Sequence, residues 1–115
     1  MDSKTTLQEL KALVKDFINK RNWEKYHNPK DLAESICIEA AELLEIFQWA
    51  TAEETFSWKS DPSKIDSIKD ELADVLIYCF SMANALDIDL SEAILKKLEK
   101  NEKKYPAEKY FGRAR

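Results

Sequence analysis

Two pairs of acidic residues interrupt segments that are otherwise apolar at helical spacing. Glu39 and Glu42 lie in "IEAAELLEIFQWA", residues 38–50, and Glu71 and Asp74 lie in "KDELADVLIYCFSMANAL", residues 69–86. At about 100° per residue, Glu39 and Glu71 each fall among the apolar side chains of their helix. Burying an unpaired carboxylate is costly, so each pair needs a proton, an outward twist or a cation.

The two pairs have the same spacing and the same hand, since Glu42 follows Glu39 by three residues and Asp74 follows Glu71 by three. If the two helices pack antiparallel, four carboxylates converge and raise one another's pKa. A hard divalent cation removes this repulsion. Oxygen ligands without His or Cys favour Mg²⁺ or Mn²⁺ over zinc or copper, and the pattern therefore predicts a magnesium site, with manganese as the alternative.

Protein-bound Mg²⁺ keeps several waters and takes substrate phosphates as further ligands, so such a site would form half of a phosphate clamp. One ExxE alone is more often a surface pair, whereas two such motifs in apolar faces favour metal binding. Glu45 lies about 240° from Glu39 and is either a base behind the ligands or a surface charge. The same acids would also serve a non-enzymatic bundle that binds a protein partner, or a nucleotide-binding regulator without turnover.

The composition predicts an all-α chain that positions these acids on facing helices of a four-helix bundle. The sequence has 115 residues, one Gly and three Pro, with 44% hydrophobic and 35% charged residues. This length suits one domain, residues 1–115. Cap signals predict four helices. They begin at Thr5 with Gln8, at Asn28-Pro29, at Asp61-Pro62 and at Asp89 with Glu92, and end near Asn22, Ala50, Leu86 and Tyr105-Pro106.

Charge is distributed unevenly along the chain. The net charge is −4, but the segment from Ser91 onward carries eight Lys and Arg against four acids, so the first ninety residues carry −8. This suits an anionic ligand held through metal ions and argues against nucleic acid as a partner, although the lysines also fit a merely solvated helix. The absence of a leader or membrane span, with Cys37 and Cys79 as small core residues, predicts a cytoplasmic protein.

The third predicted helix is apolar almost all round beyond Leu72. Ala73, Ile77 and Phe80 lie on the side away from Glu71. A helix that is apolar all round must be covered on every side, which one small chain can hardly achieve. The sequence therefore predicts a homo-oligomer, either a dimer or a dimer of dimers.

Three segments resemble the MazG-like all-α nucleoside triphosphate pyrophosphohydrolases, and within them the dCTP pyrophosphatase branch. They are "HNPKDLAESICIEAAELLEIFQW", "KDELADVLIYCFSMANALDIDL" and "KLEKNEKKYP". The resemblance runs from about Trp23 to Pro106. It implies a four-helix fold in dimers or tetramers, and hydrolysis of a (deoxy)nucleoside triphosphate to the monophosphate and pyrophosphate.

The resemblance also implies roles for individual residues. Magnesium would be bound by Glu39, Glu42, Glu71 and Asp74, and the Lys-x-x-Asn element of the family falls on Lys97 or Lys100 with Asn101. Lys104 stands where some relatives have Arg, which reduces a bidentate phosphate contact to a point charge. In the mechanism we expect, water attacks the α-phosphorus, Glu42 or Glu45 accepts its proton, and the residues Lys100, Asn101 and Lys104 neutralise the leaving pyrophosphate.

Aromatic residues near the two motifs are candidates for binding the base. Trp23, Trp49 and Tyr78 resemble base-pocket positions of the dCTP pyrophosphatase branch, whereas Tyr26 and Phe47 fit a core role better. Stacking binds every base, so the choice of base must come from polar groups at the pocket edge. His27 and the backbone of its loop are the candidates, and we expect a pyrimidine preference with dCTP or a 5-modified dCTP as the best substrate.

Overall fold

The computed structural model describes residues 1–114, which contain helices and no strand. The all-α class is thus confirmed. The long helices are α1 (Leu7–Lys20), α2 (Pro29–Phe47), α4 (Pro62–Ala85) and α5 (Leu90–Lys104). Short helical turns fill the links, namely η1 (Glu24–Tyr26), α3 (Ala52–Thr55), η2 (Trp58–Ser60) and α6 (Ala107–Tyr110). Of these four short elements, the sequence predicted only one turn, in the link that holds α3 and η2.

Side-chain caps explain where the long helices begin. The side chains of Asn28, Asp61 and Asp89 each accept a hydrogen bond from a backbone N–H in the first turn of the following helix, as predicted. The predicted cap at Thr5 is wrong. Thr6 caps α1 instead, because its hydroxyl accepts from the backbone N–H of Glu9 at 3.1 Å.

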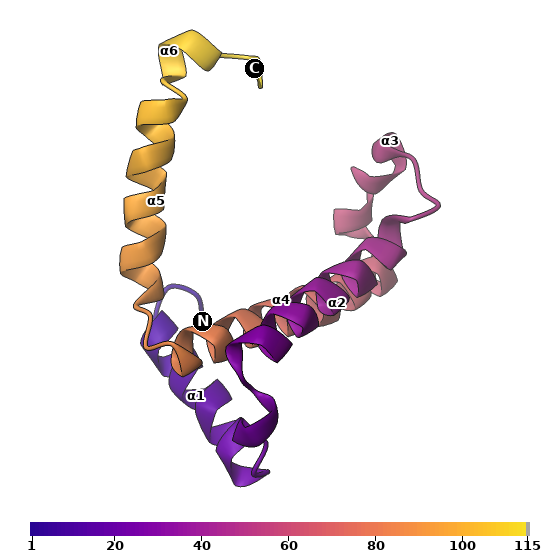
Figure 1. Ribbon diagram of the computed structural model, residues 1–115. Coiled ribbons are helices and arrows are strands. Elements are labelled where there is room, and N and C mark those ends of the chain that lie inside the picture. The colour runs from indigo at the N-terminus through magenta and orange to yellow at the C-terminus, as the bar shows by residue number, and fades with distance from the viewer. Residues whose placement is uncertain (115) are drawn as a thin grey trace.

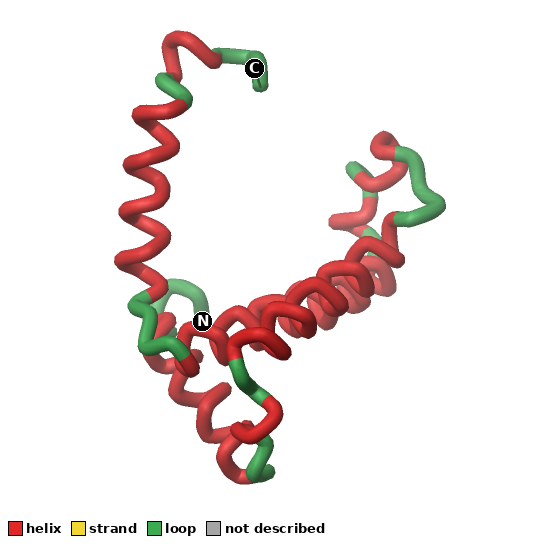
Figure 2. Tube along the Cα trace, viewed as in Figure 1, coloured by secondary structure: helices red, strands yellow, loops and turns green. Residues whose placement is uncertain are grey.

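Helices α2 and α4 form a long antiparallel pair, and α1 crosses this pair near the end of α4 (Figure 1). The segment with α3 and η2 closes the opposite end of the pair. Beyond α4 the chain turns and α5 rises away from the other helices, with only short loops between the elements (Figure 2). Within residues 1–114, α5 packs along no other helix. One chain therefore supplies the predicted helices without closing them into a bundle.

The buried core lies where α1, α2 and α4 meet and is small. Its apolar members are Ile18, Leu32, Phe80 and Ala83. The chain exposes 9456 Å², against about 6,500 Å² expected for a compact protein of this mass. Its radius of gyration is 17.2 Å, against about 13 Å expected. The single chain thus leaves about 3,000 Å² of extra surface open to contacts.

The structure also bears on the predictions about membrane spans and about the two cysteines. No helix within the described residues is both long enough and apolar enough to cross a membrane. Cys79 is half-buried, but Cys37 is exposed on α2, so the expectation that both thiols lie in the core is wrong for Cys37 in the single chain. The prediction rested on its place in an apolar helical stretch, but the side chain stays exposed among residues 1–114.

Candidate metal centre

Packing of α2 against α4 brings three of the predicted carboxylates together. Glu39 and Glu42 come from α2, Glu71 comes from α4, and one carboxylate oxygen of each lies within 4.8 Å of the others. The antiparallel pairing that the motifs required is therefore present, and we call these three residues the carboxylate cluster.

The carboxylate cluster is strained electrostatically. Burial, followed by the neighbouring Glu42 carboxyl and the charges of Asp74 and Glu71, raises the pKa of Glu39 to about 7. Burial and the Glu42 carboxyl, followed by the charges of Asp74 and Asp70, likewise raise the pKa of Glu71. Both shifts have the cause that the sequence predicts, which is acids set inside an apolar face with other acids beside them.

No basic side chain relieves this strain in the described part of the chain. Glu39 Oε2 and Glu71 Oε2 are buried without a hydrogen-bond partner there. The ion pairs of residues 1–114 are surface pairs within single helices, and none involves the cluster. Two buried, unpartnered carboxylate oxygens beside a third carboxylate are a donor set that fits a hard divalent cation such as Mg²⁺ or Mn²⁺.

Other acids extend the site on the side open to solvent. Asp74 is half-buried and acts on the cluster through its charge, although it does not belong to the group of oxygens within 4.8 Å. An open depression beside the cluster is lined by Glu42, Glu45, Ile46, Ser67, Asp70 and Glu71. The depression gives water a route to the carboxylates and places Glu45 within it. Sequence reasoning missed Asp70, whose position beside Glu71 in "KDEL" was the available signal.

Two of the predicted base-binding residues, Tyr78 and His27, lie together; Tyr78 is about one turn beyond Asp74 along α4, and His27 comes from the link before α2. The His27 ring stacks on Tyr78 with ring centroids 6.0 Å apart and planes at 17°. Burial lowers the pKa of His27, so the neutral imidazole is favoured. Trp23 is 43% exposed and meets Phe17 edge to face, at a centroid distance of 6.0 Å.

Trp49 lies elsewhere. It follows the C-terminal end of α2, is 89% exposed and lines a second open depression with Trp58 and Lys64. Trp23 precedes the N-terminal end of the same helix, whose 19 residues span about 28 Å. A single base cannot contact both tryptophans within one chain.

The predicted phosphate contacts are also separate from the cluster. Lys100, Asn101 and Lys104 lie on the last turns of α5, which points away from the α2–α4 pair (Figure 1). Asn101 is half-buried and its carbonyl accepts from the Tyr105 backbone N–H at 2.7 Å. Within one chain, the structure does not bring these side chains to the carboxylate cluster.

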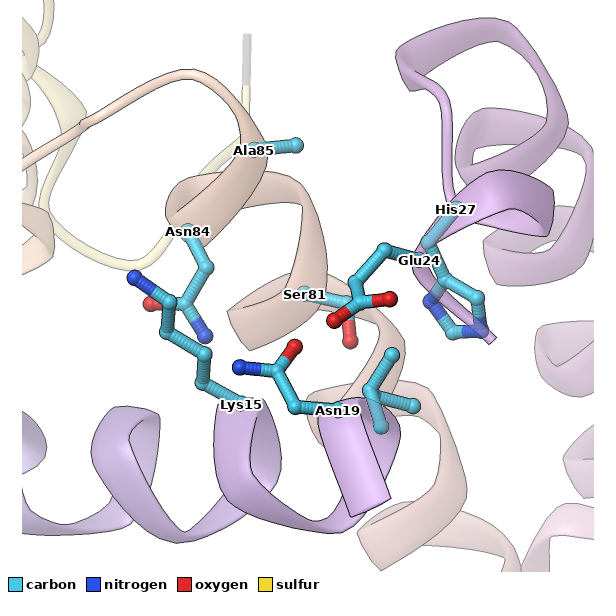
Figure 3. A pocket seen from close by; sticks show the side chains of 8 residues that line it. Lys15, Asn19, Glu24, His27, Ser81, Asn84 and Ala85 are labelled. Atoms are coloured by element: carbon cyan, nitrogen blue, oxygen red, sulfur yellow. The ribbon is translucent and has the colours of Figure 1, made fainter. Parts of the chain in front are cut away.

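Sequence reasoning also missed a cavity at the other end of α4. It lies between α1, the link with η1, and the last turns of α4, and Glu24, Ser81 and Asn84 are among its lining residues (Figure 3). A serine inside the apolar run "YCFSMANAL" was the available signal. The cavity could not be inferred further, because three separate segments form it.

Comparisons with known proteins agree with this geometry. A sequence model of the MazG-like family matches residues 34–115. Human dCTP pyrophosphatase 1 is 36% identical over 102 residues, and bovine dCTP pyrophosphatase 1 is 34% identical over 112. The matches cover 89% and 97% of this chain, respectively, but only 60% and 66% of the two relatives. This chain thus spans less than two thirds of the length of either curated relative.

A solved structure extends the likeness to three dimensions. The crystal structure of a pyrophosphatase from Archaeoglobus fulgidus superimposes with a TM-score of 0.78 at 44% sequence identity. The match covers 87% of this chain and 92% of the archaeal one. The family model covers both acidic motifs and α5, and the structural match supports the same helical arrangement. The chain belongs to the MazG-like family.

Proposed function

We propose that this protein hydrolyses nucleoside triphosphates to the monophosphate and pyrophosphate, with Mg²⁺ as cofactor and dCTP or a 5-modified dCTP as preferred substrate. The observation that carries the proposal is the pair of buried, unpartnered oxygens of Glu39 and Glu71 beside Glu42. The names of the human, bovine and archaeal relatives support the reaction class.

In this proposal some carboxylates bind the metal ion and another accepts a proton from the attacking water. Glu39 and Glu71, with Glu42 and Asp74, would hold the cation, which supplies charge neutralisation for the phosphates and acidifies a bound water. Mn²⁺ would fit the same oxygens. Glu42 or Glu45 would accept a proton from the attacking water, since both line the open depression beside the cluster. The water oxygen bonds to the α-phosphorus as the bond to the pyrophosphate oxygen breaks.

The proposal includes a homodimer or homotetramer. Leu72, Leu76 and Ile77 are 47%, 46% and 40% exposed along the middle of α4. Together with the extra surface of the extended chain, this apolar stretch suits an interface between copies, since obligate interfaces bury about 2,000–5,000 Å². Assembly would also let Lys100, Asn101 and Lys104 of one chain reach the phosphates bound by another. Light scattering that shows a stable monomer at micromolar concentration would contradict it.

One assay tests the proposed reaction. The protein is incubated with each dNTP and Mg²⁺, and pyrophosphate release is measured with EDTA as control. We expect metal-dependent release that is fastest with dCTP. Nucleotide binding without release would instead indicate a regulator without turnover, and neither binding nor release would favour a protein-interaction bundle. We also propose a cytoplasmic location, supported by two cysteines that are free in the structure.

A further inference from the structure

The turn between α4 and α5 is held from two sides at Ile88. Asp87 has a φ of 53°, and the Ile88 N–H donates to the Ala83 carbonyl at 2.9 Å. This is the hydrogen bond of a Schellman motif, which ends α4. The Ile88 carbonyl accepts a hydrogen bond from Lys11 Nζ of α1 at 2.6 Å. Because Asp89 already caps α5, the direction of α5 is determined where these two bonds meet.

Lys11 is attached to α4 as well as to the turn. Its backbone carbonyl accepts a hydrogen bond from the Asn84 side-chain amide at 3.0 Å, while its Nζ donates to Ile88. The residue is half-buried where α1 passes the start of α5 (Figure 1). The two hydrogen bonds, made at opposite ends of one residue, therefore connect α1, the last turn of α4 and the α4–α5 turn.

Few other contacts fix the direction of α5. An open cleft of about 570 Å³ lies between the first turns of α1 and α5 and reaches the turn itself. Within residues 1–114, α5 packs along no other helix. Of the hydrogen bonds in this part of the chain, only that of Lys11 joins α1 to residues 86–91. The orientation of α5 thus depends on the turn and on this lysine.

The length of α5 magnifies any change at the turn. Lys104 follows Asp89 by 15 residues, which is about 22 Å along the helix. A tilt of about 10° at the turn would move Lys104 by about 4 Å at this helical rise. Donor–acceptor distances in hydrogen bonds vary by only a few tenths of an ångström. A small change at the turn would therefore break contacts made at the far end of α5.

Lys11 lies too far from the carboxylate cluster to act on it directly. Its partner Asn84 follows Glu71 by 13 residues, or about 20 Å along α4. We propose that Lys11 is a positioning residue, which sets the direction of α5 by holding the Ile88 carbonyl. Through α5 it orients the proposed phosphate contacts, and this second step rests on the proposed function. These contacts are Lys100, Asn101 and Lys104.

The first test measures the direction of α5 without substrate or metal. Spin labels are attached at Asp66→Cys on α4 and Glu102→Cys on α5, both exposed positions, with the two native cysteines replaced by alanine. Double electron–electron resonance gives the distance between the labels, and dilution with unlabelled protein removes distances between chains. Glu102 lies about 20 Å from Asp89, so a tilt of about 10° moves it by about 3 Å.

We expect Lys11→Met to shift or broaden this distance distribution by about 3 Å or more, because methionine has no hydrogen to donate. Lys20→Met is the matched control. Lys20 also lies on α1 and makes only an exposed pair with Asp16, so its loss should leave the distribution unchanged.

Steady-state kinetics test the link to the phosphates. Lys11→Met should raise KM for dCTP about threefold to tenfold and leave kcat within about twofold, as expected when binding alone is weakened. In a chain that already carries Lys100→Ala and Lys104→Ala, it should raise KM no further, because effects that pass through the same contacts are not additive. Mn²⁺ affinity of the carboxylate cluster should stay unchanged in Lys11→Met.

The two measurements separate this inference from the proposed function. A shifted distance without any pyrophosphate release would contradict the proposed function and support the role of Lys11 in directing α5. An unchanged distance distribution in Lys11→Met would overturn the inference, whatever the protein hydrolyses. An equal rise in KM with and without the lysines of α5 would overturn the link between Lys11 and the phosphates.

Discussion

The α2–α4 pair packs along its length, whereas α5 leaves Leu95 and Leu98 63% and 58% exposed. In the pair, contact between two helices of one chain assembles the carboxylate cluster. On α5, the basic side chains and Asn101 are not among the residues that form the cluster or line the depression beside it in the described part of the chain. The contrast teaches that packing within one chain is enough to assemble the carboxylate cluster, whereas the proposed phosphate contacts of α5 would require packing between chains.

We expect the largest effect when one carboxylate is removed from the cluster between α2 and α4. We expect Glu71→Gln or Glu39→Gln to lower turnover at least about 100-fold, because even groups behind metal ligands cost about 10- to 100-fold when changed. Pyrophosphate release at saturating Mg²⁺ measures the effect. The controls are Glu34→Gln and Asp66→Asn on exposed faces of α2 and α4. Near-wild-type turnover in either ligand variant would show that the cluster is not the metal site.

A second change addresses assembly. Leu76→Lys places a charge in the exposed apolar stretch of α4, and burying that charge in an interface is costly. We expect dissociation to smaller species in light scattering and a turnover loss of about tenfold or more, on the scale of other buried unpaired charges. Asp66→Lys on a polar face of the same helix is the control. A monomeric Leu76→Lys variant with full turnover would show that one chain suffices.

A mixing experiment tests whether the basic residues of α5 act on the site of another chain. Lys100→Ala combined with Lys104→Ala should raise KM for dCTP about tenfold, since two phosphate contacts are lost. Mixing this variant with Glu71→Gln should recover more activity than the two give separately, because mixed oligomers contain one site with intact parts from both chains. Strictly additive activities after subunit exchange would show that the basic residues act within their own chain or not at all.

The smallest expected effect concerns the stability of the metal-free cluster. Because the pKa of Glu39 is raised to about 7 in the folded protein, folding favours its proton. Its destabilising effect is absent below the unfolded pKa of about 4.3 and complete above the folded pKa. In EDTA, the Tm of Glu39→Gln should therefore exceed that of wild type by an increasing margin from pH 5.5 to pH 8. A margin that does not change with pH would contradict the assigned burial of this carboxylate.

Much of the fold and of the metal centre could be predicted from local sequence signals. Asn28, Asp61 and Asp89 cap helices because a short polar side chain acts on its own first turn, and the sequence alone displays this. Glu39 and Glu71 were also predictable, since helical periodicity sets them within apolar stripes. The cap of α1 was misplaced by one residue because Thr5-Gln8 and Thr6-Glu9 present the same spacing.

Features that depend on several segments could not be predicted. The direction of α5 follows from the turn at Asp87, which has a φ of 53°, and not from its own periodicity. Trp49 was expected near the cluster, but the helix ends at Phe47 and leaves the ring exposed beyond it. Ser81 and Glu24 form a cavity only because α1 crosses α4 near the link that holds η1.

The central claim is that the carboxylate cluster binds a divalent cation, and Mn²⁺ titration followed by electron paramagnetic resonance tests it most directly. At pH 8, where Glu39 is ionised, we expect saturable binding to wild type and to Glu34→Gln. Binding to Glu39→Gln and Glu71→Gln should be at least about tenfold weaker. Equal Mn²⁺ affinity in all four proteins, or no saturable binding to wild type, would contradict the account.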